Sequence, residues 1–462
     1  MRPTAPTHAL VGLAVAVSAC LPTVAFECAD ESQCSRMRDG QCVQGNCTYP
    51  DDACASGRRY SDYAERSVAG KCVADGSEGA ASSSAAASSG STSGGPIPSD
   101  WWDCAWKQRA RIVFGGAPGP ALVDFTVLVA IDHAALPATF ADGGADLRFV
   151  DGETVLVHEI ERFDPAGTSL VWVRVPELRT GEDDGIMLYW DNPEAMPLPI
   201  ASAWNDAHVG VWHLGDDVND STDVGANGSD DSDGPTPAVI GEGRRFMGDG
   251  ASINVGSASP LDDVFSGGGT VLAWVRADAL GGAGFTRIAG KSLTDPGHTG
   301  WKMYLVDEPE EAGEPNHSLG FQRDGEFNPA AWSGPTDALA GDGQWRFVAL
   351  TFCDDLEVCG SICADDCGSD DCTPDAGVRP RFFVDGAPVL TIETRALGFP
   401  AISDASDQLV LGRGPAGSEG LDGALDEVRV ARTVRCDSWM RAEYLSTTGA
   451  LAQLGAAEAC PS

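Results

Sequence analysis

The stretch LDGALDEVRVAR, residues 421–432, most constrains what this chain can fold into. Apolar residues at Leu425, Val428 and Val430 interrupt polar ones with a period near two, and a turn sequence, Asp-Gly, stands just before them. The pattern is typical of a half-buried β-strand that follows a tight bend. Such a strand needs partner strands to satisfy its backbone hydrogen bonds, so the region is predicted to form a sheet.

Strand-like runs also precede this stretch. QWRFVALTF at 344–352 and RFFVDGAPVL at 381–390 are rich in apolar and aromatic residues. The second run contains a Val-Asp-Gly turn, which predicts a hairpin. A long insertion separates the two runs.

The order of these pieces resembles the laminin-G-like, concanavalin-type jelly-roll domains. The resemblance is carried by WHL at 212–214, DSTDVGANGS at 220–229, RRFMGDGASINV at 244–255, TVLAWVRAD at 270–278 and the strand at 421–432. It implies two antiparallel sheets packed face to face over residues 201–458. Because such domains are mostly binding modules, the resemblance implies binding, although a fold alone does not name a function.

A further group of strand-like runs begins at Trp101, separated by Gly, Pro and Asp clusters. The order of a Trp-led strand, DLRF, HEIE, WVRVP and a closing YWDN resembles a bacterial domain-of-unknown-function family, number 2341, which commonly precedes a laminin-G-like domain. The closing residues 189–192 depart from the more usual Tyr-Tyr-Gly-Asn. The predicted fold class is therefore all-β, with a small β-sandwich domain over 100–200 ahead of the jelly roll.

The charge of the chain restricts its partners. Thirty Lys and Arg against 69 Asp and Glu leave a formal net charge of −39 over 462 residues. Such a charge repels phosphate backbones and anionic membrane surfaces. Nucleic acid is not expected as a partner, and a membrane only through a lipid anchor. The acidity has two interpretations, solubility alone or the binding of divalent cations.

The N-terminus is predicted to be an export signal. Arg2 supplies a short positive region, and residues 9–19 form an apolar run too short to span a bilayer. The end of this run, Val-Ser-Ala-Cys20, resembles the bacterial lipobox, in which the cysteine is acylated and becomes the first mature residue. Leu21 is not the aspartate associated with inner-membrane retention, which implies an outer-membrane or cell-surface lipoprotein. Ordinary signal cleavage after residues 23–25 is the alternative, for a secreted protein.

Cysteine usage agrees with export. Of the 15 cysteines, 14 remain once Cys20 is set aside, an even number that favours disulfides in an oxidising compartment. Residues 21–75 contain too few large apolar side chains for a core, so disulfides are expected to stabilise this Cys-rich segment, with zinc as the alternative. Residues 76–99, rich in Ser, Ala and Gly, are predicted to be a disordered linker. The cysteines of the segment are Cys28, Cys34, Cys42, Cys47, Cys54 and Cys72.

A second cysteine cluster lies within the predicted jelly roll. Residues 353–372 hold five cysteines and seven acidic residues, without Lys or Arg, in the insertion between two predicted strands. A disulfide-stapled loop is expected, with a metal cluster as the alternative. Because five is odd, at least one of these cysteines needs a partner elsewhere. The candidates are Cys353, Cys359, Cys363, Cys367 and Cys372 in the cluster, and Cys104, Cys436 and Cys460 outside it.

Catalytic motifs are weak. His158-Glu159 opens like the zinc motif HExxH, but Arg162 stands at the fifth position and the run alternates like a strand. Glycoside hydrolysis needs two carboxylates across a cleft, for which Glu159 with Glu161 and the acidic run at 307–311 are candidates. The pair lies outside the predicted jelly roll, and the run has the composition of a loop. The protein is therefore predicted not to be an enzyme.

Structural calcium is the cofactor that the sequence favours. Asp426 occupies the strand whose aspartate, in related concanavalin-type sandwiches, often turns towards a calcium ion, and the resemblance implies that role for this position only. Asp249 in the MGDG turn and Asp216 after WHL are predicted partners, because oxygen ligands on Asp- and Gly-rich turns suit calcium. The alternative for Asp426 is a carboxylate that accepts hydrogen bonds from backbone amides.

Two further charges interrupt apolar strands in the first β domain. Arg148 and Glu159 both lie in such strands, and a buried charge persists only when it is paired. A structural ion pair between them is one hypothesis, and exposure of both to water is the other.

These features together predict an exported, lipid-anchored surface protein. Its predicted work is non-catalytic recognition or adhesion, with the jelly roll binding carbohydrate or a surface protein. A polysaccharide-active glycoside hydrolase and a structural envelope protein without a ligand are the two alternatives.

Overall fold

The computed structural model describes residues 41–43, 46–50, 54, 56–60, 71–73 and 101–461, the last range with gaps at 117–120, 138, 180–184, 199–201, 249, 280–284, 293–298, 307–316, 325–328, 336, 338, 340, 354–379, 396–400 and 415–418. The chain divides into two compact units, residues 1–92 and 93–462. Several predicted features lie outside the described residues: Cys20, the linker at 76–99, Asp249, Cys28, Cys34, Cys359, Cys363, Cys367 and Cys372.

Unit 1 contains a small antiparallel sheet. Its strands are β1 (Gln41–Val43), β2 (Asn46–Pro50) and β3 (Arg58–Tyr60). A disulfide joins Cys54 to Cys72, 18 positions apart, and Cys42 is disulfide-bonded as well. Such a bridge stabilises a domain with a small core by limiting the freedom of the unfolded chain.

The first part of unit 2 is a sandwich of two antiparallel sheets. Its strands are β4 (Gln108–Phe114), β5 (Leu122–Asp132), β6 (Arg148–Asp151), β7 (Thr154–Leu156), β8 (His158–Arg162), β9 (Thr168–Leu178), β10 (Gly185–Trp190) and β27 (Ala452–Ala459). One sheet has the order β27–β4–β10–β6–β7, and the other β5–β9–β8. Alternate residues of β4, namely Ala110, Ile112 and Phe114, point into the core between the sheets, as the period of a strand requires.

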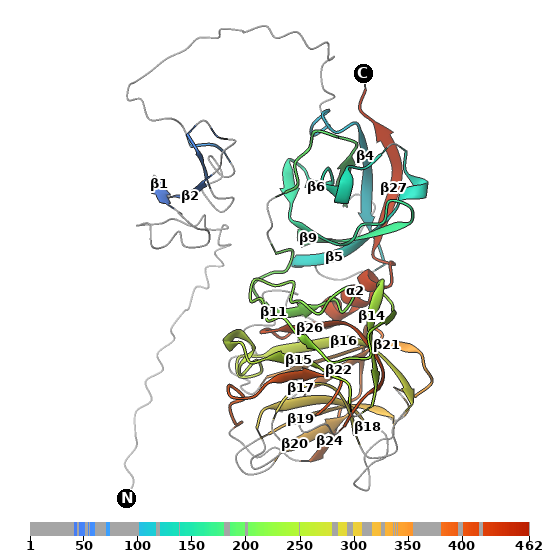
Figure 1. The fold of residues 1–462 in the computed structure, drawn as a ribbon. Helices are drawn as coiled ribbons and strands as arrows, with labels where there is room; N and C mark the ends of the chain where they lie inside the picture. Colours follow the sequence, from blue (N-terminus) through green and yellow to red (C-terminus); the bar gives the residue numbers. More distant parts are fainter. Residues whose placement is uncertain are drawn as a thin grey trace, which may run out of the picture. The chain divides into compact units, whose positions relative to one another are not determined.

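The last strand of the described chain completes this first sandwich. β27 pairs antiparallel with β4, with Ala452 opposite Phe114 (Figure 1). Close to the end of this pairing, a disulfide joins Cys104 to Cys460. The sequence-based boundary assigned residues up to 458 to the jelly roll, because the run AQLGAAEA carries no signal for its partner strand.

The second part of unit 2 is a larger sandwich. Its strands are β11 (His208–Trp212), β12 (Ser229–Asp230), β13 (Pro235–Pro237), β14 (Glu242–Met247), β15 (Ile253–Gly256), β16 (Gly269–Ala279), β17 (Phe285–Lys291), β18 (Trp301–Val306), β19 (Ser318–Arg323), β20 (Ala330–Ser333), β21 (Trp345–Phe352), β22 (Arg381–Val384), β23 (Ala387–Val389), β24 (Ile392–Arg395), β25 (Leu409–Leu411) and β26 (Asp422–Ala431). One sheet has the order β13–β14–β26–β16–β21–β22–β23, with β11 also paired to β26. The other has the order β12–β15–β25–β17–β18–β19–β20–β24. The all-β prediction is confirmed.

The predicted hairpin at 381–390 is also confirmed. β22 and β23 pair antiparallel, and the turn residues Asp385 and Gly386 have φ values of 49° and 75°. Two successive positive φ values are typical of a type I′ turn, whose twist matches that of the strands it joins.

The sheet formed by β26, β16 and β21 is buried on both faces. On one face, Val271, Val428 and Leu350 belong to the core of the second sandwich. On the other face, Leu272 and Phe347 belong to the same hydrophobic cluster as the core of the first sandwich. Burial on both faces explains why these strands are apolar almost throughout their length.

One helix lies between the two sandwiches (Figure 1). α2 (Asp437–Thr447) begins after Cys436, whose sulfur accepts a hydrogen bond from the backbone N–H of Trp439. Trp439 and Met440 are buried in the cluster that the sandwiches share. This helix is not among the elements predicted from the sequence. Cys353 and Cys436 are both disulfide-bonded.

The disulfides Cys54–Cys72 and Cys104–Cys460 indicate an exported protein, because such bonds persist in oxidising compartments. Within the described ranges, no helix is both long enough and apolar enough to cross a membrane.

Candidate functional site

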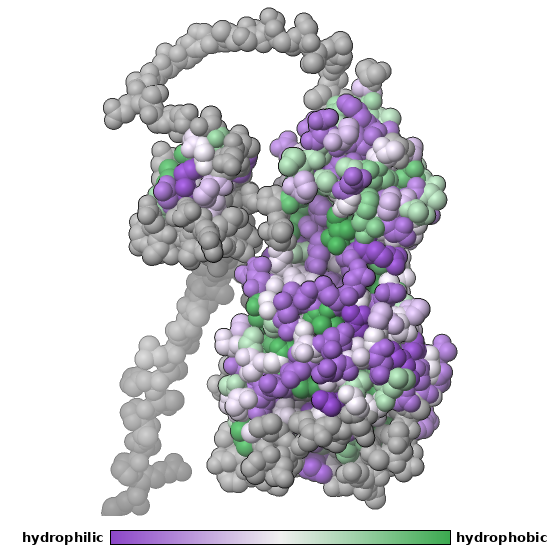
Figure 2. Space-filling view, viewed as in Figure 1, coloured by the Kyte–Doolittle hydropathy of each residue, from purple (hydrophilic) through white to green (hydrophobic). Residues whose placement is uncertain are grey.

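A polar cavity of about 1130 Å³ opens in unit 2. Its walls come from β8, from residues 213–223 after β11, and from the short 3₁₀ turn η3 (Asp142–Gly144) with the residues that follow it. Hydrophilic residues cover much of the face of unit 2 shown in Figure 2. Carboxylates outnumber arginines in the lining: Asp142, Glu159, Glu161, Asp216, Asp217, Asp220, Asp223 and Glu242 against Arg148 and Arg162.

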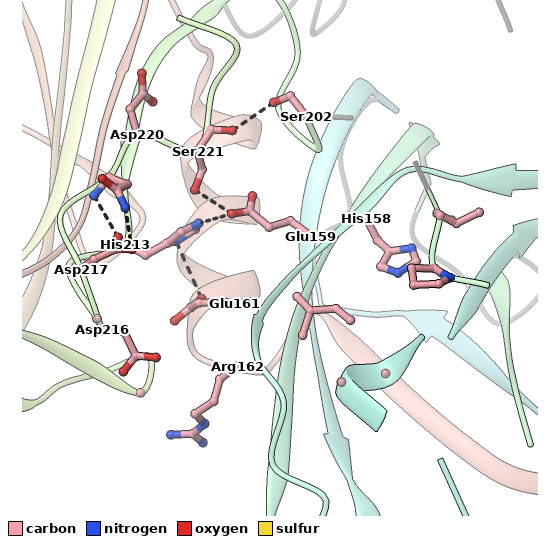
Figure 3. Close-up of a pocket in the computed structure, with 18 of the residues that line it drawn as sticks. His158, Glu159, Glu161, Arg162, Ser202, His213, Asp216, Asp217, Asp220 and Ser221 are labelled. Atoms are coloured by element: carbon pink, nitrogen blue, oxygen red, sulfur yellow. Dashed lines mark hydrogen bonds and ion pairs between the residues drawn. The ribbon is translucent and has the colours of Figure 1, made fainter. Parts of the chain in front are cut away.

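β8 contributes Glu159 and Glu161. The strand lies at the edge of its sheet and pairs with β9, with a register shift between Ile160 and Arg162. Glu159 accepts hydrogen bonds from Trp204 Nε1 at 2.8 Å and from Ser221 Oγ at 2.6 Å. Glu161 accepts one from Trp172 Nε1 at 2.7 Å. The two carboxylates are therefore fixed at the cavity wall by the buried Trp204 and Trp172 and by the half-buried Ser221, which Figure 3 shows beside Glu159.

His213 follows directly after β11 and joins the carboxylates (Figure 3). Its Nδ1 lies 2.7 Å from Glu427 Oε1 and 3.7 Å from Glu161 Oε2. Its Nε2 lies 3.5 Å from Glu159 Oε1. The imidazole stacks on Trp172 with ring centroids 5.6 Å apart and an angle of 18° between the planes.

Glu427 reaches this cluster through a bulge in β26. Leu272 of β16 pairs with Arg429 and Trp274 pairs with Asp426, so two residues of β26 stand opposite one residue of β16. Glu427 has a φ of 52°, which is uncommon for a residue other than glycine. The extra residue places Asp426 and Glu427 between the core positions Leu425 and Val428. Bulges of this kind often redirect side chains at functional sites.

Arg429 supports the cluster from behind. Its guanidinium forms ion pairs with Glu427 and Glu443, each at 2.6 Å. It also lies 4.4 Å from the ring centroid of Trp172 and 4.6 Å from that of Trp204. These rings and carboxylates together enclose the arginine, whose side chain is 1% exposed.

The surroundings of the cluster shift the pKa values of its carboxyl groups in opposite directions. Burial raises the pKa of Glu161 to about 7, with the charges of Glu427 and Glu159 adding to the effect and that of His213 opposing it. Burial also disfavours the charge of Glu159, but hydrogen bonds and the charge of His213 hold the pKa of this group below its usual value. Burial disfavours the charged form of His213, yet the neighbouring carboxylates, Glu427 first, raise its pKa well above the ordinary range.

The structure places the residues predicted to bind calcium as follows. Asp426 is buried in β26, where its Oδ2 accepts a hydrogen bond of 2.9 Å from the backbone N–H of Ile240. Burial and the charge of Glu427 raise the pKa of Asp426 well above its usual value. Asp216 lines the cavity, and Asp249 is not described. The calcium site therefore stays a prediction.

Both hypotheses for Arg148 and Glu159 are wrong: the two do not pair with each other, and Arg148 is buried rather than exposed to water. The guanidinium of Arg148 donates to the backbone carbonyls of Ala145, Leu147 and Met196. Glu159 instead contacts Trp204, Ser221 and His213. Backbone carbonyls therefore accept from three of the five N–H donors of this arginine.

His213 and Glu427 were missed as site residues, and Glu159 with Glu161 were set aside because they precede the jelly roll. The cluster joins residues of both sandwiches, which no local pattern reveals. One signal was present: the spacing from Leu425 to Val428 is three rather than two, which is how a bulge interrupts the period of a strand.

A comparison with protein families matches residues 143–222 to the "Domain of unknown function (DUF2341)". The matched segment contains Glu159, Glu161, His213 and Ser221. It covers 80 of the 462 residues, counted from 143 to 222. A comparison with curated proteins finds no match.

Solved structures similar to the chain are distant in sequence. Domain 4 of AbnA, an extracellular arabinanase from Geobacillus stearothermophilus, in complex with arabinotriose, is 17% identical over 51% of this chain and 96% of that one, with a TM-score of 0.34. The binding domain of Paraclostridial Mosquitocidal Protein 1 is 13% identical over 52% of each chain, with a TM-score of 0.37. A CBM40 of Ruminococcus gnavus IT-sialidase, bound to sialyllactose, is 15% identical over 38% and 82%, with a TM-score of 0.26. TM-scores this low carry no functional argument.

Proposed function

We propose that this protein recognises a ligand without catalysis, and that the cavity at β8 and His213 is its binding site. The observation that carries the proposal is the set of fixed acceptors in the cavity wall. Glu159 and Glu161 are held by hydrogen bonds from Trp204, Ser221 and Trp172. Acceptors that are already ordered lose little conformational entropy when a ligand binds.

The chemistry of the lining favours a carbohydrate. Sugar hydroxyls are donors, and the cavity offers carboxylate acceptors such as Asp216, Asp217 and Glu242 beside Glu159. A volume of about 1130 Å³ is slightly above the range of about 300–1,000 Å³ that is usual for small-molecule sites, so the cavity has room for more than one sugar ring. A surface protein that presents hydroxyl or cationic groups is the other partner that this surface suits.

Location and cofactor belong to the same proposal. Acylation of Cys20, with residues 76–99 as a tether, would hold the binding unit at the outer membrane or the cell surface. Palmitate labelling of a Cys20→Ser variant tests the anchor, since loss of the label is expected.

Calcium bound by Asp426, Asp249 and Asp216 would act as a structural brace. A melting temperature that falls on chelation and recovers with Ca²⁺ tests the brace.

A glycan array with the purified protein tests recognition. Binding to at least one glycan is expected, and Glu159→Gln is expected to weaken it more than about tenfold, because a charge-assisted acceptor is lost. Glu153→Gln is the matched control, since Glu153 lies exposed in the turn between β6 and β7. Silence on every glycan, or equal effects of the two substitutions, would contradict the proposal.

Glycoside hydrolysis is the second candidate function. Glu159 and Glu161 precede the predicted jelly roll, yet both line the cavity. This chemistry needs two carboxylates that flank the scissile bond, and Glu159 with Glu161 are the candidate pair. Incubation with polysaccharides and measurement of new reducing ends separates the candidates. Release that Glu161→Gln abolishes would establish hydrolysis, whereas binding without release supports recognition.

A further inference from the structure

Two side chains of the cavity wall, Glu161 and His213, form a set of metal-ligand atoms with the buried Glu427. One such atom from each of Glu161, His213 and Glu427 lies within 4.8 Å of the other two. His213 Nδ1 stands between the carboxylates, 2.7 Å from Glu427 Oε1 and 3.7 Å from Glu161 Oε2. Two ligands of a tetrahedral zinc ion, each about 2.1 Å from the metal, lie about 3.4 Å apart. Small rotations of these side chains would therefore produce a coordination shell.

The surroundings of this set carry an excess of carboxyl groups. Glu159, Glu161 and Glu427 all approach the single imidazole of His213. Arg429, the cation paired with Glu427, is shared with Glu443. A buried excess of carboxylates is unfavourable unless a cation compensates it. A divalent ion that displaces a proton from His213 would add positive charge at this point, because a histidine binds a metal only in its neutral form.

An independent observation comes from Asp426, which is fully buried next to Glu427. Its Oδ2 accepts from Ile240, but its Oδ1 has no hydrogen-bond partner. In β26 it directly precedes Glu427, one of the three residues of the set. Buried polar atoms without partners are uncommon, and a bound ion is one of the explanations for them.

We propose that Glu161, His213 and Glu427 bind a first-row divalent transition metal, of which Zn²⁺ is the test case. An imidazole nitrogen suits zinc and its neighbours in the series, whereas Ca²⁺ prefers six to eight oxygens. Glu161 and His213 line the cavity, so the fourth position of the metal is open to a ligand there. This inference goes beyond the proposed function and does not depend on the identity of the ligand.

The test uses the whole purified protein, stripped with a chelator and dialysed. Calorimetric titration with Zn²⁺ is expected to show one site that both Glu161→Gln and His213→Gln weaken. The expected loss exceeds about 100-fold, because changes outside the ligand shell already cause about 10- to 100-fold. Glu242→Gln is the matched control, since Glu242 is an exposed carboxylate of the same cavity. It is expected to leave the affinity unchanged.

Co²⁺ in place of Zn²⁺ provides a readout that does not depend on the variants. A site of one imidazole and two carboxylates with an open position is expected to give the strong visible absorption of four- or five-coordinate Co²⁺. If His213→Gln does not fold, the zinc affinity of Glu161→Gln and the Co²⁺ spectrum of the unchanged protein still test whether the metal site exists. Zinc affinity that is equal in Glu161→Gln and Glu242→Gln, a pale octahedral Co²⁺ spectrum, or displacement by equimolar Ca²⁺ would each overturn the inference. Glycan binding that survives chelation would leave recognition intact and the metal unnecessary for it.

Discussion

Arg429 is a single residue between the two sandwiches that is expected to contribute strongly to stability. Its guanidinium contacts two carboxylates and two tryptophan rings in a site with 1% side-chain exposure. We expect Arg429→Met to lower the free energy of unfolding by about 3–5 kcal/mol, because Glu427 and Glu443 would be left buried without a partner. Urea denaturation measures the change.

The matched control is Arg346→Met. Arg346 pairs with Asp342 at 3.0 Å, but its side chain is 29% exposed. Because a surface ion pair contributes little, the expected change is below about 1 kcal/mol. A loss of stability as large as that of Arg429→Met would mean that the burial of an ion pair does not determine how much it contributes to stability.

His158 makes the stability depend on pH. Burial, aided by the charge of Arg148, lowers its pKa to about 4 from an ordinary value of 6.5. Since the unfolded chain takes up this proton first, the contribution is fully present above pH 6.5 and is lost as the pH falls towards 4. We expect a loss of about 2–3 kcal/mol over this window. Urea denaturation of His158→Gln and of the unchanged protein at each pH measures the difference in their free energies of unfolding, in which the contribution of the carboxylates cancels. If the two free energies change in parallel with pH, the prediction is contradicted.

At the scale of elements, the V-D-G turn between β22 and β23 is held against α2. A Cβ on Gly386 would meet Tyr444 Cβ at 2.6 Å, and its φ of 75° already disfavours other residues. We expect Gly386→Ala to lower the free energy of unfolding by about 2–4 kcal/mol, from strain plus the clash. Thermal unfolding followed by circular dichroism measures it.

The chain contains its own control for this substitution. Gly152 lies in a second V-D-G turn, between β6 and β7, with a φ of 59° and no atom within 4 Å of its would-be Cβ. Gly152→Ala should therefore show only the backbone strain, about 1 kcal/mol. Equal losses at the two glycines would show that the contact with Tyr444 is unimportant.

Elements with strong local signals could be predicted from the sequence. The strands at 270–278, 344–352 and 421–432 have apolar runs of strand length, and the turn at Asp385 requires the residues found there. α2 was not predicted, because Trp439 and Met440 are buried by neighbours that the sequence does not identify. The candidate site could not be predicted for the same reason, because Glu161, His213 and Glu427 are brought together only by packing between the sandwiches.

At the scale of the whole molecule, the Cys104–Cys460 disulfide links positions 356 residues apart. We expect the free energy of unfolding of the double variant Cys104→Ser, Cys460→Ser to be lower by about 2–5 kcal/mol, because the unfolded chain gains conformational freedom without the bond. Chemical denaturation under oxidising conditions measures this loss. A variant as stable as the parent would show that the pairing of β27 with β4 is sufficient.

The same bond turns residues 104 to 460 into a covalent ring. A single cut of the main chain anywhere inside that ring leaves one connected molecule, whose two fragments separate on a gel only after reduction. Secreted proteases are a common hazard outside a cell, and a protein closed in this way could be nicked there without shedding half of its mass.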